Sequence, residues 1–156
     1  MENKNIKIAN LADFPQWVET VAHRCQDQWN AKWWWAFEST LYRTQHALQI
    51  EWLPQTFIAL FGNKAVGTVA LRPTDLRCRM DLSPWLASLY VLPEYRKQGI
   101  GTLLQNHLLR SAKKSGFDQI FLCTELQWYY EHNGWKFMEM VPCANGEKVR
   151  VYKHKL

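Results

Sequence analysis

Apolar side chains in the first part of the chain recur at the spacing of an amphipathic helix. Trp17, Val21 and Cys25 follow one another at four-residue steps, which places them on one face of a helix. Residues 14–29 are therefore predicted to form a helix whose apolar face packs on the core. Asp13 precedes this pattern and is the expected N-cap, because its carboxylate can accept hydrogen bonds from the first turn.

A second helical pattern follows, and a short alternating stretch precedes both. Trp34, Phe37 and Leu41 lie at three- and four-residue steps, so residues 34–48 are expected to form a second helix. Residues 5–9 alternate between polar and apolar side chains, as a half-buried strand does. The N-terminal part is thus predicted to contribute one strand and two helices.

Two β-rich runs come next, with a turn between them. Residues 55–61 and 64–71 are rich in aliphatic, aromatic and threonine side chains. The pair Gly62-Asn63 separates them, and a two-residue loop of these residue types is typical of a β-hairpin. Residues 72–84 are polar and contain prolines, so they are predicted to form a loop or a sheet edge.

The middle of the chain has the pattern of a βαβ unit. An apolar run through residues 86–91 is followed by a glycine-containing turn, by helical spacing over residues 102–114, and by a second apolar run in residues 117–124. Gly116 is the expected terminator of the helix. Because a helical crossover joins parallel strands, the two apolar runs are predicted to be parallel neighbours.

The C-terminal part is predicted to hold a short helix and a hairpin. Residues 126–133 can form two helical turns that end at Gly134. Residues 135–141 and 149–155 have strand patterns and are joined by a turn containing Asn-Gly, so they are expected to pair as a terminal hairpin.

The order of these elements predicts an α/β fold built on one mixed sheet. The runs give about six to seven strands, with helices flanking both faces. At 156 residues, with 47% hydrophobic and 21% charged side chains, the chain is long enough for a single domain with its own core. That domain is expected to span residues 1–156.

Composition and charge narrow the classes of partner. No apolar run reaches the roughly 18 residues of a membrane span and the N-terminus is polar, so a cytoplasmic protein without a membrane partner is expected. The net charge of +5 is scattered along the chain, so nucleic acid is only the weaker alternative partner. The four cysteines form no metal-binding pattern, so we expect no metal site.

The turn after residues 86–91 has the features of a phosphate-binding loop. Gly99 and Gly101 lack Cβ atoms, so the backbone can approach an anion closely, and the following helix points unpaired N–H groups at the same place. A dinucleotide fingerprint would need glycine at Leu104, and a Walker loop would need a lysine before Thr102. The structural alternative is a tight strand-to-helix turn that needs glycine for its backbone alone.

The same segment resembles the pyrophosphate loop of the GNAT family of N-acetyltransferases. The family pattern Arg/Gln-x-x-Gly-x-Gly/Ala is matched by Arg96, Gly99 and Gly101. The resemblance implies the acyl-CoA N-acyltransferase fold, with acetyl-CoA (coenzyme A) as cosubstrate. It implies that the backbone of three residues holds the pantetheine arm and that seven hold the pyrophosphate: Leu89, Tyr90 and Val91, then Arg96, Lys97, Gln98, Gly99, Ile100, Gly101 and Thr102.

A second segment, Trp128–Trp135, is similar to the family's Phe-Tyr-Glu-x-x-Gly-Phe segment. Tyr130 matches the tyrosine that in many relatives donates a proton to the departing thiolate of coenzyme A. A phenol suits this step because its pKa of about 10 keeps it protonated at neutral pH. The alternative is that Tyr130 packs under the cofactor or at a sheet edge.

The sequence indicates the general base less clearly than the cofactor loop or the general acid. An amine acceptor arrives as an ammonium and must lose a proton before it attacks a thioester. Many relatives carry a glutamate on the strand before the loop, where this chain has Trp85, Leu86 and Ser88. Glu125, which follows the second parallel run, is the first catalytic candidate, and Asp81 or a water relay are the alternatives.

A cluster of four tryptophans falls where the family builds the acceptor side of its cleft. It could wall a pocket for an amine, pack helices together, or form a homodimer contact. The expected function is acetyl transfer from acetyl-CoA to a primary amine, on a small molecule or peptide, by direct attack in a ternary complex. The alternative is an inactive acyl-CoA sensor. The cluster is Trp29, Trp33, Trp34 and Trp35.

Overall fold

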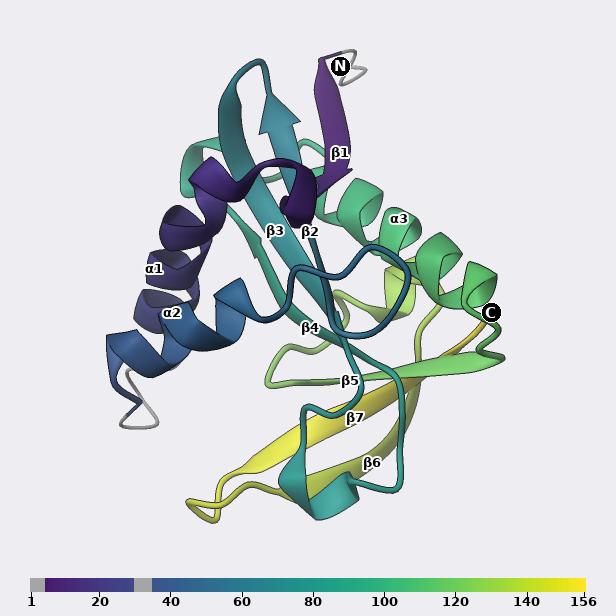
Figure 1. The fold of residues 1–156 in the computed structure, drawn as a ribbon. Helices are drawn as coiled ribbons and strands as arrows, with labels where there is room; N and C mark the ends of the chain where they lie inside the picture. The colour runs from purple at the N-terminus through teal and green to yellow at the C-terminus, as the bar shows by residue number, and fades with distance from the viewer. Residues whose placement is uncertain (1–4, 30–34) are drawn as a thin grey trace.

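The computed structural model describes residues 5–29 and 35–156, and its strands form one seven-stranded sheet in the order β1-β2-β3-β4-β5-β7-β6 (Figure 1). The strands are β1 (Ile6–Asn10), β2 (Gln55–Phe61), β3 (Lys64–Arg72), β4 (Trp85–Val91), β5 (Gln119–Thr124), β6 (Lys136–Pro142) and β7 (Lys148–Lys155). The helices are α1 (Val18–Gln28), α2 (Phe37–Gln45) and α3 (Ile100–Lys114). Both predicted hairpins and the predicted βαβ unit are confirmed.

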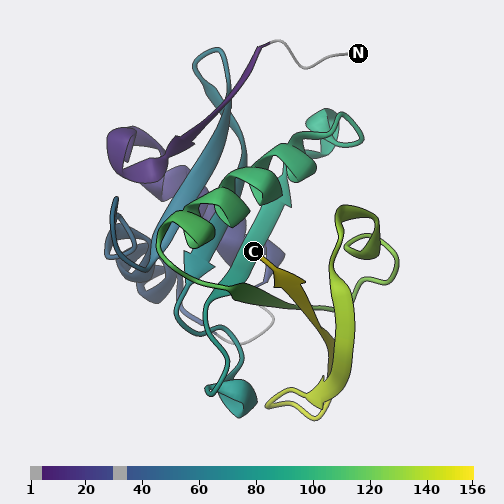
Figure 2. The same ribbon diagram turned by 90° about the vertical axis from the view of Figure 1, so that its right-hand side faces the viewer.

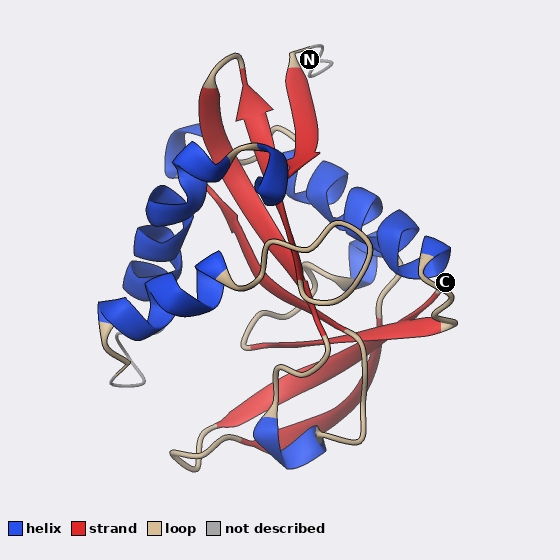
Figure 3. Cartoon of the chain, in the orientation of Figure 1, coloured by secondary structure: helices blue, strands red, loops and turns tan. Residues whose placement is uncertain are grey.

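Helices cover both faces of the sheet, as the sequence predicted. α1 and α2 lie on one face, and α3 crosses the opposite face (Figures 2 and 3). Apolar burial holds each layer in place: Leu104 and Leu108 of α3 are fully buried in the largest core cluster, and Val21 of α1 packs with Ile58 of β2 in a second. No helix in the described ranges is long and apolar enough to cross a membrane.

β4 and β5 are the one parallel pair among the described strands, and they separate soon after they meet. Their register pairing is confined to Trp85 and Phe121. On its other side β4 stays paired with β3 as far as Val91. The edge of β4 that faces β5 is therefore left without a strand partner over residues 86–91, and backbone groups at such an edge can pair with an extended ligand.

The prediction that Asp13 caps the first helix is wrong. The chain makes two 3₁₀ turns before α1, and Asp13 lies inside the first of them. That turn is capped by Asn10, whose Oδ1 accepts a hydrogen bond from the Ala12 N–H at 2.9 Å. Pro15 opens the second turn, so the α-helix begins only at Val18.

Two other helices are shorter than predicted. The second helix covers Phe37–Gln45, with Ala36 as its N-cap. Trp34 lies outside the described residues. Residues 126–133 form a single 3₁₀ turn, Glu131–Asn133, instead of two helical turns. Trp128 has a φ of 70°, which no right-handed helix contains, so the helix cannot extend through it.

Candidate active site

A β-bulge changes the direction of β4 in its middle. Two β4 residues, Ser88 and Leu89, lie opposite Val69 of β3, so the strand carries one extra residue at this point. Ser88 has a φ of 53°, a left-handed conformation that costs a non-glycine residue about 1–3 kcal/mol. The bulge turns the segment after it, which is the segment expected to pair with the pantetheine arm.

The glycine loop ends in a left-handed residue at the start of α3. Gly99 has a φ of 80° and is the N-cap of the helix, which begins at Ile100, two residues earlier than predicted. A side chain with a Cβ is strained in that conformation, whereas glycine is not. The first N–H groups of α3 have no partner within the helix, so this end can receive an anion.

Two residues, Arg96 and Thr102, hold the loop against neighbouring elements. Arg96 donates a hydrogen bond from Nε to the Val91 carbonyl at 2.8 Å, and its guanidinium lies 5.5 Å from the centre of the Tyr90 ring. Thr102 donates a hydrogen bond to the side chain of Asn133 at 3.1 Å. The Thr102–Asn133 hydrogen bond joins the two motif segments, which lie before and after β5 in the sequence.

The expected acid, Tyr130, lies in a cluster of aromatic rings. Its side chain is 7% exposed, and its ring centre lies 6.1 Å from that of Trp135 and 6.2 Å from that of Tyr152. No hydrogen bond engages its hydroxyl within residues 5–29 and 35–156. Burial, together with the nearby Tyr129 hydroxyl, raises the pKa of Tyr130 well above its ordinary value, so the phenol keeps its proton.

Tyr129, which no sequence motif singled out, lies against the glycine loop. A Cβ added to Gly101 would come within 2.5 Å of the Tyr129 hydroxyl. One turn further along α3, Gln105 accepts a hydrogen bond from the indole N–H of Trp135 at 3.0 Å in a buried position. The second motif segment therefore packs directly on the first turns of α3.

The two carboxylates considered as bases lie in different surroundings. Glu125 is exposed just beyond the end of β5. Asp81 is held in two hydrogen bonds by Arg79, at 3.0 and 2.8 Å, and these bonds lower the pKa of its carboxyl. Neither side chain lines the cavity described next.

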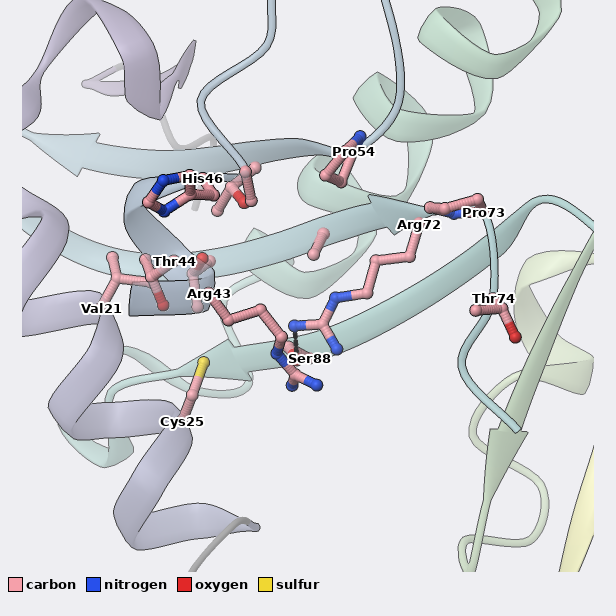
Figure 4. Close-up of a pocket in the computed structure, with 14 residues that line it drawn as sticks. Val21, Cys25, Arg43, Thr44, His46, Pro54, Arg72, Pro73, Thr74 and Ser88 are labelled. Carbon is pink, nitrogen blue, oxygen red and sulfur yellow. Dashed lines mark hydrogen bonds between the residues drawn. The ribbon is translucent and has the colours of Figure 1, made fainter. Parts of the chain in front are cut away.

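A cavity of about 360 Å³ lies between the α1–α2 layer and the sheet (Figure 4). Its lining includes Arg43 of α2, Arg72 at the end of β3, and Ser88 in the β4 bulge. Cys25 of α1 also lines it, and burial raises the pKa of this thiol, so it is not set up as a thiolate nucleophile. The sequence did not predict this convergence, because the lining side chains come from two helices, three strands and the loops between them.

The tryptophan cluster is described only in part. Trp33 and Trp34 lie outside the described residues. Trp29 packs against the α1 core and meets the Tyr90 ring edge-on at 6.3 Å. Trp35 supports the guanidinium of Arg43, which lies 4.5 Å from its ring centre. Trp29 thus contacts β4 and also has a packing role, whereas Trp35 contacts Arg43, which lines the cavity.

Sequence comparison places these features in a family. The family model for the acetyltransferase (GNAT) family matches residues 15–134. N-alpha-acetyltransferase 50 from Danio rerio is 33% identical over 93 residues, which cover 53% of this chain and 51% of that protein. The match therefore spans about half the length of this curated relative.

Solved structures support the same assignment at the level of the fold. An aminoglycoside 6'-N-acetyltransferase complexed with coenzyme A superimposes with a TM-score of 0.76 at 18% identity, over 96% of each chain. The aminoglycoside 6'-N-acetyltransferase from Enterococcus faecium gives a TM-score of 0.71 at 18% identity, again over 96% of each chain. With a matching family model over most of its length and this shared fold, the chain belongs to the GNAT acetyltransferase family.

Proposed function

We propose that residues 1–156 act as a single N-acetyltransferase domain that transfers an acetyl group from acetyl-CoA to a primary amine. The observation that carries the proposal is the junction of β4 and α3. There a strand with an open edge leads, through a 3₁₀ turn at Pro93–Tyr95, to a left-handed glycine at a helix N-terminus. This arrangement suits a ligand with an extended amide-containing arm and a pyrophosphate, because one end pairs with backbone and the other needs N–H donors.

In the proposed reaction the amine attacks the thioester carbonyl directly, and the carbon–sulfur bond breaks as the carbon–nitrogen bond forms. A main-chain N–H of residues 89–91 donates a hydrogen bond to the carbonyl oxygen as it becomes negative. Tyr130 gives its proton to the departing sulfur, and burial keeps the phenol protonated until that step. The proposed cofactor-binding residues are the ten predicted from the sequence, Leu89–Val91 and Arg96–Thr102.

Glu125 is the proposed acceptor of the proton that the amine loses, directly or through water. Glu125→Gln is expected to lower kcat about tenfold, less than the usual effect of removing a base, because water can replace an exposed carboxylate. Asp81→Asn is the comparison: Arg79 already engages Asp81, so kcat should not change. Equal rates for Glu125→Gln and the wild type would leave proton removal to water alone.

The function is tested by thiol release from acetyl-CoA in the presence of a panel of amines. We expect amine-dependent release of coenzyme A and a matching N-acetylated product by mass spectrometry. Tight acetyl-CoA binding without turnover on any amine would favour the alternative, an acyl-CoA sensor. The relatives leave the acceptor open, since one is named an N-alpha-acetyltransferase and the others aminoglycoside 6'-N-acetyltransferases. The panel should therefore contain peptides, amino acids, polyamines and aminoglycosides.

A further inference from the structure

The cavity beside the β4 bulge has two guanidinium groups in its lining. Arg43, Arg72 and His46 line it, and its lining residues include no aspartate or glutamate. At about 360 Å³ it is near the lower end of the volumes that hold small molecules. Its size and charge both favour a small ligand that carries a negative group.

Arg43 is available to such a ligand. It remains accessible to solvent, and the ring of Trp35 supports one face of its guanidinium. No carboxylate forms an ion pair with it anywhere in residues 5–29 or 35–156. Partial burial and the charge of Arg72 lower the pKa of Arg43, and the charge of Asp75 offsets part of that effect, so the two guanidiniums affect each other across the cavity. An anion between them would relieve that repulsion.

Arg72 links the cavity to the reacting segment. Its Nη2 donates a hydrogen bond to the Ser88 hydroxyl at 3.1 Å (Figure 4), and its Nη1 lies 3.4 Å from an oxygen of Asp75. Asp75 offsets one of the two guanidinium charges, so the group of three keeps a net positive charge. Because Ser88 precedes Leu89, an anion held at Arg72 lies next to the segment proposed to hold the thioester.

We propose that Arg43 and Arg72 bind the carboxylate of the amine acceptor, so that the acceptor is a free amino acid. This inference rests on the proposed N-acetyltransferase function. In an α-amino acid the amine and the carboxylate share one carbon atom, so a carboxylate on the two arginines leaves the amine beside Ser88. A polycationic acceptor, such as an aminoglycoside or polyamine, would meet like charge here.

The test compares each free L-amino acid with its C-terminal amide in the thiol-release assay. The amide keeps the amine and the side chain but lacks the negative charge. We expect at least one free amino acid to be acetylated with a kcat/KM well above that of its amide. Arg43→Met and Arg72→Met should each raise KM for that amino acid roughly 10- to 100-fold, as loss of a charge-assisted hydrogen bond does, and change KM for the amide little.

Arg110→Met is the matched control, because it removes the same charge from the exposed surface of α3 on the opposite face of the sheet. Arg72→Met also removes the contact with Asp75. Arg72→Lys keeps a positive charge beside Asp75, so it should retain part of the preference for the free amino acid over its amide. Equal use of acids and amides, a preference unchanged in both methionine variants, or turnover confined to amines without a carboxylate would overturn the inference. Failure of the wild type to bind acetyl-CoA in a calorimetric titration would instead overturn the proposed function.

Discussion

Tyr130→Phe is expected to lower kcat by about 100-fold or more, which is the usual effect of removing a general acid, and to leave acetyl-CoA affinity nearly unchanged. The hydroxyl is lost while the ring still fills its place beside Trp135 and Tyr152. The departing thiolate must then take its proton from water. Thiol release under saturating substrates measures kcat, and calorimetric titration measures affinity.

Tyr152→Phe is the matched control for this change. Tyr152 belongs to the same aromatic cluster, but its hydroxyl donates a hydrogen bond to Glu131 at 2.6 Å. Its removal should cost about 1–2 kcal/mol in the free energy of unfolding and leave kcat close to the wild-type value. If Tyr130→Phe retained full turnover, Tyr130 would have no part in proton transfer and would be a packing residue.

The raised pKa of Tyr130 also fixes the sign of a pH effect. A phenol whose pKa lies above its usual value holds its proton to higher pH, so the acid form persists throughout the range from pH 7 to about 10. The kcat of the wild type should therefore show no alkaline decline in that range. A decline with an apparent pKa near 8 would point to a different acid.

Gly99→Val is expected to weaken acetyl-CoA binding roughly 10- to 100-fold. Gly99 has a φ of 80°, where a β-branched residue costs about 1–3 kcal/mol, and a shift of the loop to relieve this strain would move the N-terminal N–H groups of α3. The new side chain would also stand where the phosphates must approach. Affinity is measured by calorimetric titration with acetyl-CoA.

Gly116→Val provides the control at the other end of the same helix. Gly116 has a φ of 90° with open space around its Cβ position, so this change brings comparable backbone strain without touching the loop. It should lower the free energy of unfolding and leave acetyl-CoA affinity unchanged. Equal affinity losses in the two variants would mean that strain in α3, rather than the glycine loop, controls binding.

The glycine loop and the tyrosine segment could be predicted from the sequence because each requires particular residue types at fixed, short spacings. An N-cap residue in the left-handed conformation favours glycine, as at Gly99. Gly134 ends the turn after Tyr130 with a φ of 84°. Periodicity likewise predicted all seven strands and the crossover helix. The helix predicted over residues 126–133 failed because a single left-handed residue, Trp128, overrides local helical spacing.

The cavity and the bulge could not be predicted in the same way. Arg43 and Arg72 line the same cavity only because tertiary packing brings α2 and the end of β3 to it, and no local pattern encodes that arrangement. The left-handed residue of the bulge is a serine, a type that gives no signal for such a conformation. The proposed acetyl-CoA site could therefore be predicted from short motifs, whereas the proposed acceptor site depends on tertiary packing.

A crystal structure of the protein with acetyl-CoA tests the central claim most directly. The pyrophosphate should accept hydrogen bonds from N–H groups of residues 97–102, and the pantetheine arm should pair with the backbone of residues 89–91. The sulfur should then lie within hydrogen-bond reach of the Tyr130 hydroxyl, with the acetyl group facing the cavity at Ser88. Acetyl-CoA bound away from the glycine loop, or with its sulfur out of reach of Tyr130, would contradict the account.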